Sequence, residues 1–96
     1  MEIIFTERFL RRIEEYSDFI ALNDISKAVQ WARGVYERCE QLRSQPKSGR
    51  MVPEFNRSEI RELIHGNYRL IYEIKTNQID MLTIWRSSQE LTDETG

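Results

Sequence analysis

Apolar residues recur through the first half of this chain at the three- and four-residue spacing of amphipathic helices. A first helix is predicted over residues 7–22, with Thr6 as its N-cap. Asn23 breaks the pattern, and Asp24 can cap a second helix over residues 25–42. The apolar positions of the two helices are Phe9, Leu10, Ile13, Tyr16, Ile20, Ile25, Ala28, Val29, Ala32, Val35, Tyr36, Cys39 and Leu42. Because the connection is so short, the two helices are predicted to form an αα-hairpin.

Two small residues on the second helix indicate how it packs. Gly34 costs up to about 1 kcal/mol in a helix relative to alanine, which is typical of a position that packs closely against a neighbour. Cys39 is the single cysteine of the sequence, so it has no partner for an internal disulfide. Its place on the apolar face predicts a buried structural thiol.

The second half of the chain changes to the period of two that is typical of strands. Strands are predicted over residues 2–5, 60–64, 68–74 and 79–85. The last three are predicted to form an antiparallel meander, turning at His65-Gly66-Asn67 and around Thr76-Asn77. Residues 44–58 contain both prolines and a glycine, which predicts a loop.

These elements predict an α+β domain in the order β-α-α-β-β-β. The αα-hairpin packs on one face of a small twisted antiparallel sheet, and the other face is left partly open. The first strand is expected to join the sheet at an edge. Residues 1–96 form one domain, and the tail over residues 90–96 is expected to be flexible.

Composition agrees with a small globular protein, because 40% of the residues are hydrophobic and 31% are charged. No apolar run approaches the roughly 20 residues that span a bilayer, so a cytoplasmic protein without a membrane segment is expected. The formal net charge of −2 disfavours a protein that binds nucleic acid mainly through phosphates. The sequence contains no Cys/His cluster that would indicate a metal site and no glycine-rich loop that would indicate a nucleotide cofactor.

Arg69 is the most informative single residue. It alternates with Tyr68, Leu70 and Tyr72 along an apolar strand, where a buried arginine is costly. We therefore expect it on the open face of the sheet. It either pairs there with Glu62 or Glu73, or presents its planar fork to a phosphate or carboxylate.

Three segments together resemble the core of the RelE/ParE superfamily of bacterial type II toxins. These segments are Ile60-Arg61-Glu62-Leu63, Gly66-Asn67-Tyr68-Arg69-Leu70-Ile71-Tyr72 and Leu82-Thr83-Ile84-Trp85-Arg86-Ser87-Ser88. The upstream layout of a short strand, two helices and a Gly-Arg-hydrophobic-Pro loop is similar as well, so the resemblance covers roughly residues 2–90. It implies the family fold, in which the first strand can lie beside the central strands, and a cognate antitoxin partner.

The resemblance also assigns roles to individual residues. In the ribonuclease branch, the arginine that matches Arg69 contacts the scissile phosphate, and a nuclease reading of this chain would use Arg61, Arg69, Arg86 and His65. Arg61 matches an arginine that forms a salt bridge or contacts the target. Without a functional role, His65 is expected to be a solvated turn residue. Arg86 and Gln89 stand where many relatives carry histidine and arginine, so the usual proton-transfer pair is missing.

These departures favour the ParE-like branch, whose members poison DNA gyrase without chemistry of their own. The leading expectation is a growth-inhibiting toxin that is neutralised by an antitoxin. The alternatives are a metal-free endoribonuclease that cleaves mRNA on the ribosome, and an inactive toxin-like scaffold. Apolar surface around Ile71 and Trp85 is expected to stay partly uncovered for a partner. The predicted contact positions for target or antitoxin are Arg61, Arg69, Ile71, Thr83, Trp85 and Arg86.

Overall fold

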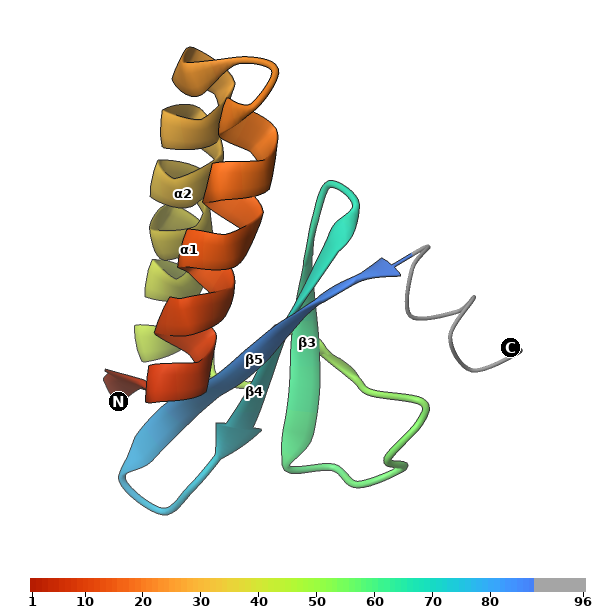
Figure 1. The fold of residues 1–96 in the computed structure, drawn as a ribbon. Helices are drawn as coiled ribbons and strands as arrows, with labels where there is room; N and C mark the ends of the chain where they lie inside the picture. The colour runs from red at the N-terminus through yellow and green to blue at the C-terminus, as the bar shows by residue number, and fades with distance from the viewer. Residues whose placement is uncertain (88–96) are drawn as a thin grey trace.

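A computed structural model describes residues 1–87 of the chain. Two helices lie side by side on one face of a five-stranded sheet (Figure 1). The elements are β1 (Glu2–Phe5), α1 (Glu7–Ala21), α2 (Ile25–Glu40), the 3-10 helix η1 (Gln41–Arg43), β2 (Arg50–Met51), β3 (Ile60–His65), β4 (Tyr68–Ile74) and β5 (Gln78–Arg86). The predicted α+β architecture is confirmed. Gln89 and the tail over residues 90–96 lie outside the described residues.

Both helices begin at the predicted caps. The Thr6 hydroxyl accepts a hydrogen bond from the Phe9 amide at 3.2 Å and donates one to the Met81 carbonyl at 2.7 Å, so it also joins α1 to β5. Asp24 accepts from the Lys27 amide at 3.1 Å and caps α2. Within residues 1–87, no helix is long and apolar enough to cross a membrane.

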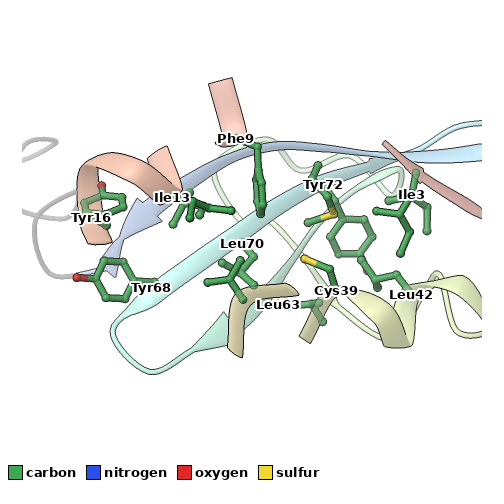
Figure 2. Close-up of a cluster of buried hydrophobic side chains, with 14 residues drawn as sticks. Ile3, Phe9, Ile13, Tyr16, Cys39, Leu42, Leu63, Tyr68, Leu70 and Tyr72 are labelled. Atoms are coloured by element: carbon green, nitrogen blue, oxygen red, sulfur yellow. The ribbon is translucent and has the colours of Figure 1, made fainter. Parts of the chain in front are cut away.

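The main core lies between the hairpin and the sheet (Figure 2). Its buried side chains are Ile3, Phe9, Ile13, Tyr16, Val35, Cys39, Leu42, Leu63, Tyr68, Leu70, Tyr72, Ile79, Met81 and Ile84. Cys39 is fully buried, as predicted, and this burial raises its pKa to about 12. Ile25 and Val29 were predicted to face this core, but both are exposed. The connecting end of the hairpin, where they lie, projects beyond the sheet (Figure 1).

The sheet has the order β1-β5-β4-β3-β2. The antiparallel meander of β3, β4 and β5 is confirmed, and Gly66 adopts a positive φ of 61° in the tight turn between β3 and β4. β1 lies at one edge and runs parallel to β5, so the sheet is mixed. The opposite edge is β2, a two-residue strand inside the segment that was predicted to be entirely loop.

A β-bulge breaks the period of two in β5. Tyr72 pairs with Met81, whereas the preceding Ile71 pairs with Thr83, so Leu82 is the extra residue. The bulge returns Ile84 to the helix side, where it joins the main core.

Part of the face of the sheet away from the helices, which was expected to be partly open, is covered. Val52, Ile60 and Ile71 form a second buried cluster there, with Leu82 and Trp85 packed against it. Val52 belongs to the loop between β2 and β3, so this loop covers part of the face. The predicted uncovered surface at Ile71 is therefore wrong, since Ile71 is only 1% exposed.

Candidate functional site: a buried arginine and its carboxylates

Arg69 is the second residue of β4, the central strand of the sheet, and lies directly opposite Ile64 on β3 and Trp85 on β5. Only 5% of the residue is exposed, so the prediction that it stands on an open face is wrong. The loop between β2 and β3 folds over this face and brings a carboxylate with it. Ion pairs offset the free-energy cost of burying this arginine.

Two carboxylates bind the Arg69 guanidinium. Its Nε donates to Glu62 Oε1 at 2.6 Å, which confirms one of the two predicted partners. Its two terminal nitrogens form a fork on the other carboxylate: Nη1 donates to Glu54 Oε2 at 3.0 Å, and Nη2 donates to Glu54 Oε1 at 2.7 Å. Glu54 takes the place of the predicted alternative, Glu73. Sequence reasoning missed Glu54 because nothing in a loop pattern tells where its side chains lie.

Glu62 links Arg69 to a second arginine. Its side chain is fully buried, and its Oε2 accepts a hydrogen bond from Arg50 Nε on β2. The four side chains Arg50, Glu54, Glu62 and Arg69 therefore balance in charge. The bonds with Glu54 raise the pKa of Arg69, and the same bonds lower the pKa of the Glu54 carboxyl below its usual value.

Trp85 forms one wall of this site. The Arg69 guanidinium carbon lies 5.1 Å from the centroid of the Trp85 ring, in cation–π contact. Phe55 of the loop packs on the same ring, with 5.9 Å between the two ring centroids. A surface pocket of about 250 Å³ opens beside the ion pairs. It is lined by Arg50, Pro53, Glu54, Arg69 and Ser87.

Arg61 has a different position from Arg69. It is directly opposite Tyr72, whose side chain is in the main core, so Arg61 belongs to the helix side of the sheet. Its guanidinium donates to the backbone carbonyls of Ser58 and Gly49, each at 2.9 Å. Arg61 thus ties the residues that precede β2 and β3 to each other.

His65 is also on the helix side, and it is not the solvated turn residue that was expected. A Cβ added to Gly34 would lie 2.8 Å from the imidazole, which confirms the predicted close approach at this glycine. Trp31 lies on the same side, with its ring centroid 6.5 Å from that of the histidine. Burial lowers the pKa of His65; a hydrogen bond to the Trp31 backbone opposes this shift and the charge of Arg38 adds to it.

Arg86 ends β5 directly opposite Tyr68, which again places it on the helix side. Its guanidinium carbon lies 5.4 Å from the centroid of the Phe19 ring on α1. The four residues of the nuclease reading are therefore divided, with Arg61, His65 and Arg86 on one face of the sheet and Arg69 on the other.

The remaining predicted contact positions differ in exposure. Ile71 and Thr83 are buried, so a partner reaches them only after neighbouring side chains move. Trp85 and Arg86 keep part of their surface accessible. Over residues 1–87, no group of three or more His, Cys, Asp and Glu side chains is arranged to hold a metal ion.

Comparison with known proteins gives a family match and structural matches. A family model described as "ParE toxin of type II toxin-antitoxin system, parDE" matches residues 3–91. A chain of the solved structure "Chromosomal ParDE TA system from P. aeruginosa" has the same fold, with a TM-score of 0.74 and 19% sequence identity. The match covers 90% of this chain and 95% of that one. No curated protein matches the sequence.

Proposed function

Because this chain belongs to the ParE toxin family of type II toxin–antitoxin systems, we propose that it stops bacterial growth by binding and poisoning DNA gyrase. Membership of a toxin–antitoxin system implies a cognate antitoxin as the partner that neutralises it. Both partners are expected in the cytoplasm, where we propose that the toxin acts.

The division of the candidate nuclease residues between two faces of the sheet carries this proposal. Metal-free cleavage of RNA needs one group to take the 2′-hydroxyl proton and another to protonate the leaving oxygen, both beside one phosphate. His65 packs against α2, whereas Arg69 lies on the far face. Because these two residues lie on opposite faces of the sheet, their positions argue against joint action on one phosphate.

The engagement of the arginines supports the same conclusion. Arg61 is bonded to loop carbonyls, and Arg69 is bonded to two carboxylates. Arginine supplies charge stabilisation but does not exchange protons easily at neutral pH. A toxin that acts by binding its target needs no such proton transfer.

Two assays with the purified toxin test the proposal. We expect a dose-dependent loss of gyrase supercoiling, and no cuts in mRNA with or without translating ribosomes. Arg57→Ala is a matched control, since it removes an arginine that pairs with Glu59 at the protein surface. Cuts in translated mRNA that disappear in His65→Gln, but persist in Arg57→Ala, would establish the ribonuclease instead.

A further inference from the structure

We propose that the pocket between Arg50 and Arg69 is a receptor for a carboxylate of a partner protein, and that Glu54 is an internal carboxylate that occupies it in the free toxin. The inference rests on the proposed function only in requiring that the toxin meets a protein partner. It does not depend on whether that partner is gyrase or the antitoxin.

The two carboxylates on Arg69 are held in different ways. Glu62 lies on β3, its side chain is fully buried, and it is shared with Arg50. Glu54 lies on the loop, and 26% of its side chain is exposed. Glu62 is thus fixed within the sheet, whereas Glu54 is the member that another carboxylate can replace.

Charge selects the kind of ligand. Without Glu54, the remaining group of Arg50, Glu62 and Arg69 carries one net positive charge. A singly charged anion restores the balance. The fork of Arg69 holds two oxygens at 2.7 and 3.0 Å, which is the bidentate geometry of a carboxylate. The net charge of −2 favours a protein carboxylate over a nucleic-acid phosphate.

The surroundings give access to such a ligand. The pocket of about 250 Å³ opens beside Glu54, and the side chain of Arg50 at its rim is 60% exposed. Residues 53–58 of the loop are all exposed, and Val52 is the residue that anchors the loop in the second core cluster. The turn that carries Glu54 can therefore move aside while Val52, Ile60 and Ile71 stay covered.

Acetate is a minimal probe for this receptor, and Trp85 is its natural reporter because it stacks on Arg69. The indole N–H signals of Trp85 and Trp31 are followed by NMR as acetate or inorganic phosphate replaces chloride at constant ionic strength. Trp31 lies on the helix side and serves as an internal reference. Glu54→Ala vacates the receptor, whereas Glu59→Ala removes a loop carboxylate that pairs with Arg57 instead.

We expect acetate to shift the Trp85 signal of Glu54→Ala in a saturable way and to raise its melting temperature. The wild type and Glu59→Ala should respond at least several-fold more weakly, because Glu54 competes for the site. Equal responses of Glu54→Ala and Glu59→Ala, or none in either, would overturn the proposal. A stronger effect of phosphate than of acetate would assign the site to a phosphate ligand and overturn the carboxylate.

Glu54→Gln provides a second test if Glu54→Ala does not fold, since it keeps the side-chain size and removes the charge. Combining it with Arg69→Lys removes the fork but keeps the positive charge, and should abolish the acetate response. The gyrase assay is independent of these measurements. A toxin that poisons gyrase but shows no acetate response would refute the receptor alone.

Discussion

Arg69 illustrates how far a single residue can be interpreted from its strand. The alternation of polar and apolar positions placed it on the face away from Tyr68, Leu70 and Tyr72, and this face assignment is right. Its partner Glu62 could be named because it lies on the neighbouring strand. Its burial could not be foreseen, because the loop that covers it has no periodic pattern.

Replacing Arg69 should destabilise the fold strongly. Arg69→Ala would leave Glu62 buried with Arg50 as its remaining ion-pair partner and would release Glu54. Breaking a buried pair in this way typically costs about 3–5 kcal/mol, whereas an exposed pair is worth about 0–1 kcal/mol. Urea unfolding of Arg69→Ala and of Arg57→Ala should show this contrast. Similar losses in the two variants would mean that Arg69 is not buried in solution.

His65 should make stability depend on pH in a predictable direction. Its pKa in the folded protein is lower than its usual value of 6.5, so below roughly pH 6.5 the unfolded chain takes up the proton more readily. This contribution is complete above that pH and is lost as the pH falls toward the folded pKa. The free energy of unfolding should therefore fall less between about pH 7 and 5 in His65→Gln than in the wild type. Parallel curves for the two proteins would contradict this assignment.

At the scale of elements, the loop between η1 and β3 is the part that sequence reasoning described least well. Prolines and glycine correctly predicted an irregular segment, but not the strand β2 or the covering of the far face. These features depend on side chains from distant strands. The Tyr72 hydroxyl accepts from the Gly49 amide at 3.0 Å and donates to the Pro46 carbonyl at 2.8 Å, while Arg61 bonds the Gly49 carbonyl.

Gly49 is the tightest point of this attachment. A Cβ at this position would lie 2.6 Å from both the Glu62 carbonyl oxygen and the Tyr72 hydroxyl. Gly49→Ala should therefore lower the free energy of unfolding by roughly 1–3 kcal/mol, because the backbone of β3 has no room to yield. Ser58→Ala in the exposed part of the same loop is the control, and should change stability by less than about 0.5 kcal/mol. Thermal unfolding of both variants measures the difference, and a Gly49→Ala protein as stable as Ser58→Ala would contradict the close approach.

The bulge in β5 shows a second limit of pattern-based prediction. Residues 79–85 were predicted as a strand, and the strand exists. A strict period of two would place Ile84 on the far face with Leu82, but the bulge returns it to the main core. An extra residue of this kind leaves no mark in a short apolar run.

For the whole molecule, the sheet separates two unequal hydrophobic clusters, a large one beneath the helices and a small one beneath the loop. The large cluster follows from strong periodic patterns, and for this reason the fold class could be predicted from the sequence. The distribution of Arg61, His65, Arg69 and Arg86 over two faces follows from strand pairing and a bulge. Arg69 and Glu62 of the candidate site could therefore be named from the sequence, but Arg50, Glu54 and the arrangement of the four side chains could not.

Because β1 pairs in parallel with β5, the sheet cannot be completed until β5 has been synthesised. Glu2 pairs with Gln78, so β1 has no strand partner until β5 has been translated. At roughly 5–20 residues per second, that wait lasts roughly 4–15 seconds. The helical hairpin relies on local contacts and can form meanwhile, but the nascent chain cannot place Trp85 beside Arg69 until β5 has been made. An antitoxin that recognises the finished sheet therefore meets its target only after β5 has been made.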